Sequence, residues 1–266
     1  MIHSSSRINI DDAVSRKEGP MHLVVQGANP LIQPSDHIYN TIMDPPGRVL
    51  ILNYKNFNTD KLSTRKGSDH DVINLINLYS QMGYITEHHT DLTGDETRAV
   101  IKGFIKKQMV KHAGCLIIVV MSHGVDEGYS FYTTDKNMFA ISDLRKNFTE
   151  TEGLKSVPKL FFFQFCRGSA EPQAQIHTDG FQQSPENIIY FFATSKGFVS
   201  YRDPNSGAPF IKTWCKVLAE HSHRMNLEEL YCEFKLQFES KSNGAKPEKE
   251  SHDFSKKFYF NPRSEN

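Results

Sequence analysis

The chain has 266 residues, with 31 basic and 31 acidic side chains and a formal net charge of zero. This balance argues against partners held by bulk charge, so we expect no nucleic-acid partner and no membrane partner. No apolar run approaches the ~18 residues that a membrane span needs, and the first residues lack a signal-peptide pattern. The four cysteines show no paired spacing, which is typical of free thiols in a reducing compartment and predicts a cytoplasmic protein.

The start of the chain differs in composition from the rest. Residues 1–43 are rich in Ser, Asp, Gln and Pro and show no periodicity, so we interpret them as a flexible leader. From residue 48 onward, apolar runs typical of strands alternate with helical patterns. The predicted strands cover residues 48–54, 84–90, 115–121, 160–168, 188–194 and 257–260. The predicted helices cover residues 72–79, 93–112, 142–148, 210–220 and 227–238.

Other segments lack either pattern. A small hairpin is predicted near residues 129–133, and residues 239–251 have the polar composition of a loop. The alternation of strands and helices predicts an α/β fold with a mainly parallel six-stranded sheet and helices on both faces. The nearly unbroken apolar strands are typical of strands that are buried on both sides.

Reactive side chains follow two of these buried strands. Cys166 comes at the end of one strand, and Ser-His-Gly at residues 122–124 ends another. If the two strands are parallel neighbours, Cys166 and His123 meet at the carboxyl edge of the sheet, where open α/β sheets place their active sites. A histidine supplies the base or ion-pair partner that a thiol nucleophile needs, and the cationic neighbour Arg167 favours the thiolate. Taken alone, each residue also fits an inert core cysteine or a surface histidine.

Several motifs occur together in one order. Gln-Phe-Cys-Arg-Gly spans residues 164–168, and Arg-Lys-Gly-Ser-Asp-His-Asp spans residues 65–71. Ser-His-Gly stands at residues 122–124, and Ala-Thr-Ser-Lys-Gly-Phe-Val-Ser-Tyr-Arg runs over residues 193–202. From residue 44 to residue 260 the chain resembles the caspase family, as a short-leader, insect-like or executioner-like member. The resemblance implies the caspase-like sandwich fold and cleavage of proteins after aspartate, with a role in apoptosis.

The resemblance also implies the catalytic groups. Cys166 would be the nucleophile and His123 the acid and base, while the backbone N–H groups of Cys166 and Gly124 would bind the oxyanion. It implies no cofactor. We expect no metal site either, because the histidines at residues 88–89 and 221–223 lack accompanying ligands at useful spacing.

Recognition of aspartate requires cations that can grip a carboxylate. Arg65 and Arg202 are the implied choices, with Gln164 as a third donor. Ser200 would make main-chain contacts with the substrate strand. Partners would be protein substrates with Asp at the cleavage site, and inhibitor-of-apoptosis proteins are further candidates.

Maturation follows from the same resemblance. Asp179 stands before a glycine in a loop without periodicity, so a cut there would separate a large subunit, residues 44–179, from a small subunit, residues 180–266. A cut after Asp12 would trim the leader, residues 1–43, which corresponds to a prodomain. Two such units would pair as a homodimer at the strand predicted over residues 257–260.

One position departs from the family pattern. Phe165 stands where a small residue usually precedes the nucleophile. Its ring either packs into the core, where it is harmless, or points into the cleft and crowds the cysteine. The alternative function is therefore a catalytically weak or inactive homologue that binds and regulates an active caspase.

Overall fold

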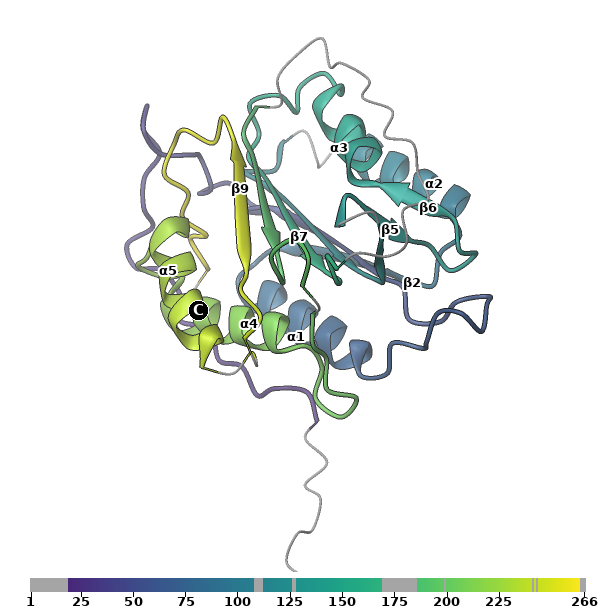
Figure 1. Ribbon diagram of the computed structural model, residues 1–266. Coiled ribbons are helices and arrows are strands. Elements are labelled where there is room, and N and C mark those ends of the chain that lie inside the picture. Colours follow the sequence, from purple (N-terminus) through teal and green to yellow (C-terminus); the bar gives the residue numbers. More distant parts are fainter. Residues whose placement is uncertain are drawn as a thin grey trace, which may run out of the picture.

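The computed structural model describes residues 19–107, 112–125, 128–168, 186–198, 200–240, 242 and 244–263. Its centre is a six-stranded sheet in the order β2-β1-β3-β7-β8-β9 (Figure 1). The strands are β1 Arg48–Asn53, β2 Ile85–Thr90, β3 Leu116–Met121, β7 Lys159–Gln164, β8 Ile188–Phe192 and β9 Glu248–His252. The first five run parallel and β9 runs antiparallel to β8. The predicted mainly parallel six-stranded sheet is confirmed.

Helices cover both faces of this sheet (Figure 1). One face carries α1 Ser68–Gln81, α4 Pro209–His221 and α5 Leu227–Glu239, and the other carries α2 Gly94–Lys106 and α3 Ile141–Thr149. Every residue of β1, β3, β7 and β8 is buried. Their unbroken apolar sequences follow from this position, because successive side chains of a strand point to opposite faces and both faces here are covered.

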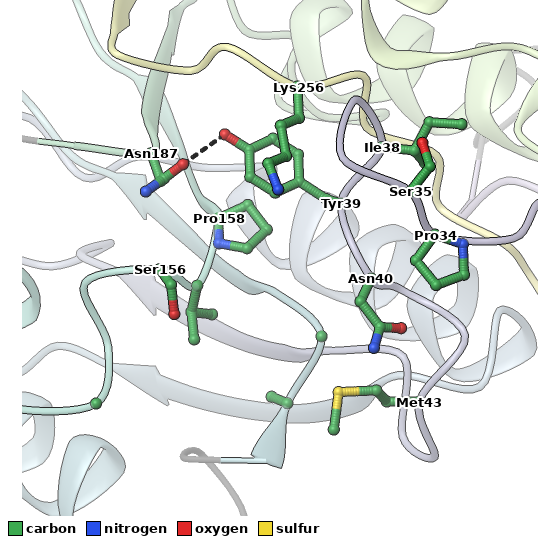
Figure 2. A pocket seen from close by; sticks show the side chains of 14 residues that line it. Pro34, Ser35, Ile38, Tyr39, Asn40, Met43, Ser156, Pro158, Asn187 and Lys256 are labelled. Carbon is green, nitrogen blue, oxygen red and sulfur yellow. Dashed lines mark hydrogen bonds between the residues drawn. The ribbon is translucent and has the colours of Figure 1, made fainter.

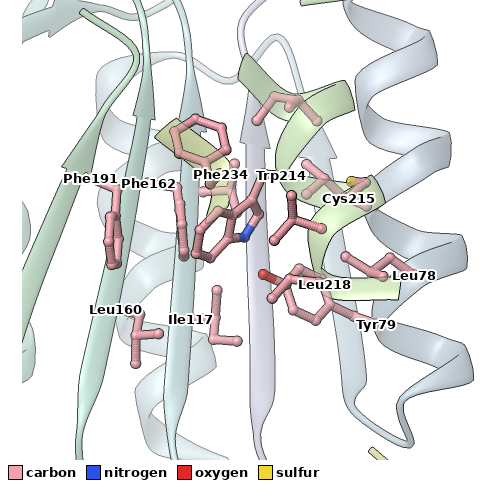
Figure 3. Packing of buried hydrophobic residues seen from close by; sticks show 14 of the residues in the cluster. Leu78, Tyr79, Ile117, Leu160, Phe162, Phe191, Trp214, Cys215, Leu218 and Phe234 are labelled. Atoms are coloured by element: carbon pink, nitrogen blue, oxygen red, sulfur yellow. The ribbon is translucent and has the colours of Figure 1, made fainter. Parts of the chain in front are cut away.

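The alternation divides the strand residues between two cores. On the side of α4 and α5, Trp214 packs on Phe162 and Phe191, with ring centroids 5.0 and 5.4 Å apart (Figure 3). On the other side, Phe161 meets Phe148 of α3 edge-on at 5.6 Å. Each core therefore packs against one face of β7, the strand that leads to Cys166.

The second helix begins as its sequence indicates. The Thr93 hydroxyl accepts the backbone N–H of Glu96, and the Glu96 carboxylate accepts the backbone N–H of Thr93 at 2.8 Å. This capping box satisfies two donors at the start of α2.

A small antiparallel sheet lies beside the carboxyl edge. It consists of β4 Gly124–Val125, β5 Ser130–Tyr132 and β6 Met138–Ala140. The hairpin predicted near residues 129–133 is confirmed as β5 and its partner strands. Because β4 starts at Gly124, this small sheet holds the loop that carries His123.

The last strand of the sheet is not the one predicted. It is β9, Glu248–His252, within the segment that we expected to be a polar loop, and it pairs antiparallel with β8. An edge strand is half exposed and carries charged side chains, so β9 lacks the apolar run that marks the inner strands. Residues 257–260, predicted as the last strand, make only a single bridge from Lys257 to Ile38, although Phe258 and Phe260 are buried.

Part of the expected leader packs on the domain. Leu23 and Tyr39 belong to the main apolar core. The backbone N–H of Ala28 donates to the carbonyl of Pro262 at 2.8 Å. Residues 19–43 thus differ from the flexible leader that composition indicates, because irregular extended chain contacts the domain without a periodic pattern. Residues 1–18 lie outside the described part of the chain.

Candidate active site

The two strands that carry the reactive side chains are neighbours. β3 pairs parallel with β7, with Met121 opposite Gln164, and the N–H of Ser122 extends the pairing to the Gln164 carbonyl at 3.3 Å. His123 and Cys166 each follow directly at the carboxyl edge of the sheet. The predicted meeting of these two segments is confirmed.

Gly124 allows the histidine loop to touch the nucleophile's backbone. A Cβ at this position would overlap the carbonyl oxygen of Cys166 and lie 2.8 Å from the ring of Phe165. No larger residue fits without moving the backbone on one side. The missing side chain therefore brings the backbone N–H of Gly124 close to the residue that carries the thiol.

The thiol of Cys166 is partly exposed and lies against one loop. The backbone N–H of Ser200 donates to its Sγ at 3.3 Å, and the carbonyl of Ser200 lies 3.7 Å from Sγ. Both backbone groups of Ser200 therefore face the sulfur, at the position where the sequence places main-chain contacts to a substrate.

His123 is oriented by a backbone carbonyl. Its Nε2 lies 2.8 Å from the carbonyl oxygen of Ser63, and its ring packs 5.0 Å from the ring of Phe57. Since a carbonyl only accepts, Nε2 carries the proton and Nδ1 is the nitrogen free to exchange one. Burial lowers the pKa of His123, the Ser63 carbonyl opposes this, and the charges of Arg65 and Arg202 lower the pKa further.

Sequence reasoning missed Ser63. It orients the histidine through its main-chain carbonyl, which every residue possesses, so no side-chain pattern could have indicated it.

The predicted carboxylate-binding groups gather beside Cys166. Gln164 donates from Nε2 to the Ser200 hydroxyl at 2.6 Å, which joins the end of β7 to the opposite loop. The Arg65 guanidinium is buried and donates to the carbonyls of Tyr54 at 3.1 Å and Gln164 at 3.5 Å. Arg202 is held by its Nε, which donates to the Lys66 carbonyl at 2.8 Å.

The electrostatics of these groups favour an anionic ligand. Burial and, after it, the charge of Arg202 lower the pKa of Arg65 to about 9. Within the described residues, Arg65 Nε and Gln164 Oε1 are buried without a hydrogen-bond partner. Two cations that repel one another in a partly dry site, with unused polar atoms, are suited to a carboxylate that pairs with both.

Arg167 does not act as we expected. Its guanidinium is turned to the edge strand, where it pairs with Glu248 at 2.9 Å and Glu250 at 3.4 Å. The interpretation that Arg167 favours the thiolate is therefore wrong, because two carboxylates neutralise its charge. The cations that interact electrostatically with the Cys166 thiol are Arg65 and Arg202.

Phe165 takes the first of its two expected positions. Its side chain is buried in the core, 5.4 Å from the ring of Phe163 and 6.2 Å from that of Phe131. The large residue before the nucleophile is thus absorbed by aromatic packing and does not crowd the cysteine.

The remaining site predictions are not reached by the structure. Asp12 and Asp179 lie outside the described residues. Among the residues that are described, no group of three or more His, Cys, Asp or Glu side chains could hold a metal ion, and no helix is long and apolar enough to cross a membrane.

A separate cavity of about 410 Å³ lies at the opposite, amino-terminal edge of the sheet (Figure 2). Tyr39, Asn187 and Lys256 line it, and the Tyr39 hydroxyl donates to the Asn187 side chain at 2.7 Å. It contains none of the predicted site residues. The described residues that we predicted to form the site lie at the carboxyl edge instead.

Comparisons with known proteins agree with this geometry. The caspase domain family model matches residues 46–259. Caspase-3 of Bos taurus is 31% identical over 198 residues, covering 70% of each chain. Caspase-8 of Mus musculus is 29% identical over 213 residues, covering 70% of this chain, which spans 44% of that relative's length.

Solved structures share the fold. The Drosophila initiator caspase Dronc superposes with a TM-score of 0.78 at 20% identity, covering 94% of this chain and 98% of the other. Caspase-1 from Spodoptera frugiperda superposes with a TM-score of 0.75 at 20% identity, covering 91% and 100%. With the matched domain spanning residues 46–259, the chain belongs to the caspase family, a family of cysteine peptidases.

Proposed function

We propose that this protein is a cysteine endopeptidase that cleaves proteins after aspartate and acts in apoptosis. The observation that carries the proposal is the buried cation Arg65, which lies beside Gln164 at the end of the nucleophile's strand. A buried charge whose hydrogen bonds go only to neutral oxygen atoms, with Asp71 as a counter-charge at longer range, is incompletely compensated. A substrate carboxylate would complete that compensation.

The proposed chemistry uses the geometry at the strand ends. Cys166 Sγ attacks the peptide carbonyl carbon, and the resulting oxyanion accepts the N–H groups of Cys166 and Gly124. His123 takes the proton of the Cys166 thiol at Nδ1 as Sγ attacks and passes it to the leaving amine when the C–N bond breaks, since Nε2 is committed to Ser63. Water then attacks the acyl-enzyme carbonyl while His123 Nδ1 takes one of its protons. The C–S bond breaks, His123 returns the proton to the sulfur, and the new carboxylic acid leaves.

Specificity comes from the same pocket. The side chain of a substrate aspartate would pair with Arg65 and Arg202 and accept a hydrogen bond from Gln164. Asparagine or alanine would leave the buried Arg65 and the half-buried Arg202 without a directly paired carboxylate, so the pocket should reject them. Ser200, whose N–H and carbonyl face the sulfur, would bind the main chain of the substrate.

Maturation is part of the proposal. A cut after Asp179 would release two chain ends in the segment that joins Cys166 to β8 and let them reorder, and a cut after Asp12 would trim the leader. The exposed edge of β9, rather than residues 257–260, would then be the edge at which two units pair. Mass spectrometry of an active preparation should show the cut at Asp179, and an uncut active protein would rule out this step.

The alternative, an inactive homologue that regulates an active relative, gains no support from Phe165. Its ring lies in the core.

The deciding experiment measures turnover of reporter peptides with Asp before the scissile bond. Cys166→Ala should abolish turnover and His123→Ala should nearly do so. Cys232→Ala is the matched control, because Cys232 is exposed on α5 and should leave turnover unchanged. Substantial turnover by the Cys166→Ala protein, or none by the natural chain, would overturn the proposal.

A further inference from the structure

A buried carboxyl group lies behind the carboxylate pocket. Asp71, in the first turn of α1, is fully buried. Its Oδ1 accepts the backbone N–H of Ala208 at 2.8 Å, and its Oδ2 has no hydrogen-bond partner among the described residues. The backbone of Gly207, with a φ of +90°, passes so close to Asp71 that a Cβ on Gly207 would overlap Asp71 Oδ1. The turn at residues 207–208 therefore rests on this carboxyl group.

This turn belongs to the loop that carries Arg202. Asp203 and Gly207 exchange two backbone hydrogen bonds of 2.9 Å, which close the loop directly after Arg202. At its other end, Arg202 Nε donates to the Lys66 carbonyl, and a Cβ on Gly67 would overlap the carbonyl oxygen of Asp203. The segment of residues 66–71 thus holds the Arg202 loop at both ends.

Asp71 is also the negative charge that the two pocket arginines share. Burial raises its pKa, the Ala208 N–H and the charges of Arg65, Arg202 and Lys212 lower it, and the result is a pKa of about 7. In return, Asp71 raises the pKa of Arg65 and of Arg202. The Cys215 thiol of α4 is the other titratable group that interacts with it.

We propose that Asp71 is the positioning residue of the carboxylate pocket, and that its negative charge holds the Arg202 loop beside Arg65. Neutralising Asp71 leaves two like charges in a buried site without their counter-charge, and Arg202, the more exposed of the two, moves outward. The pocket therefore loses affinity for a carboxylate as the pH falls through neutrality. A substrate aspartate titrates several units lower, near its ordinary pKa of about 4, so it does not cause this loss.

The test measures binding of a fluorescent peptide that ends in aspartate, by anisotropy, to the Cys166→Ala protein at pH 8 and pH 6.5. Adding Asp71→Asn should weaken binding on the order of tenfold at pH 8, the equivalent of one pKa unit of charge interaction. It should also remove most of the pH dependence. Asp69→Asn is the matched control, since Asp69 lies in the same turn but is exposed and pairs with Lys55.

Each outcome has a definite meaning. Equal or tighter binding by the Asp71→Asn variant would show that the charge only opposes the ligand, which overturns the proposal. In the active protein, the same substitution should raise KM and leave kcat within about twofold, on the same basis of one lost charge interaction in the ground state.

A second readout does not depend on substrate. Asp71→Ala removes the acceptor of the Ala208 N–H, so hydrogen exchange at Ala208 should accelerate, whereas Asp69→Ala should not change it. Unchanged protection at Ala208 would overturn the positioning role. The inference rests on the proposed function only for its ligand. Failure of the natural chain to bind or cleave any aspartate peptide would therefore contradict the proposed function. Hydrogen exchange at Ala208 would still test whether Asp71 positions the loop.

Discussion

Arg65 and Arg167 are two buried arginines at the same edge of the sheet, each 1% exposed, yet they meet opposite surroundings. Arg167 pairs with Glu248 and Glu250 of β9, and its guanidinium lies 3.9 Å from the ring centroid of Phe192. Arg65 donates to the neutral oxygen atoms of Asn53, Tyr54 and Gln164. No carboxylate of the described residues lies within ion-pair distance of Arg65.

The difference separates a structural charge from a functional one. A buried cation that has its carboxylates inside the protein contributes to stability through packing and pairing, and removing it exposes both partners. A buried cation that makes no direct ion pair, such as Arg65 with Asp71 as its more distant counter-charge, is compensated less fully. Arg167 thus ties the nucleophile's strand to the edge strand, and we assign Arg65 to the proposed substrate pocket. The predictions below test this contrast, from the largest expected effect to the smallest.

Arg65→Ala should remove transition-state binding and spare the fold. We expect kcat/KM for aspartate peptides to fall by a factor that corresponds to about 2–5 kcal/mol of transition-state binding free energy, as for truncation of one partner of a buried charge pair. The free energy of unfolding should fall by less than in Arg167→Ala, since Arg65 makes no direct ion pair and Asp71 keeps the charge of Arg202. Arg202→Ala should lower kcat/KM in the same direction. Unchanged kcat/KM in both variants would rule out this pocket.

Arg167→Ala should do the reverse. Denaturant unfolding should show a loss of about 2–4 kcal/mol, because the variant leaves a cavity under Phe192 and two carboxylates without their partner. The KM of the folded fraction for aspartate peptides should stay close to that of the natural chain. A large rise in KM without loss of stability would contradict the division of roles between the two arginines.

The two carboxylates of β9 should contribute unequally. Glu248 is the closer partner of Arg167, at 2.9 Å, while Glu250 lies at 3.4 Å. Each carboxylate is about a third exposed, at 32%, so solvent weakens both pairs. We expect Glu248→Gln to cost about 1 kcal/mol of unfolding free energy and Glu250→Gln about half of that. The same denaturant titration measures both, and the reverse order would contradict the geometry.

The smallest effect concerns the pKa of His123. The positive charge of Arg65 lowers that pKa, so Arg65→Ala should raise it. The acid limb of the pH–rate profile then moves to higher pH. Arg167→Ala should leave the pKa unchanged. An NMR titration of the His123 ring distinguishes the two variants, and equal shifts in both would show that general charge, not the pocket, sets the value.

The contrast also shows what a sequence pattern can and cannot indicate. The runs before His123 and Cys166 predicted buried parallel strands correctly, because inner strands covered on both faces must be apolar throughout. Strand β9 was missed because an edge strand pairs with only one neighbouring strand and stays partly exposed. It therefore keeps charged side chains and has no apolar run. Residues 19–43 were also misjudged, because extended chain packs through backbone contacts that leave no period in the sequence.

By itself, the sequence determined the order of the helices and of the five parallel strands, and the family resemblance with the candidate reactive groups that it implies. Local patterning and motif spacing encode these features directly. The partners of each charge were decided only by the tertiary structure. Arg167 follows the nucleophile in sequence, yet it pairs with β9, more than 80 residues away, while Arg65 and Asp71 are brought to the thiol's pocket by the packing of α1 and the Arg202 loop. Electrostatic energy depends on distance and burial in space, and neighbours in sequence determine neither.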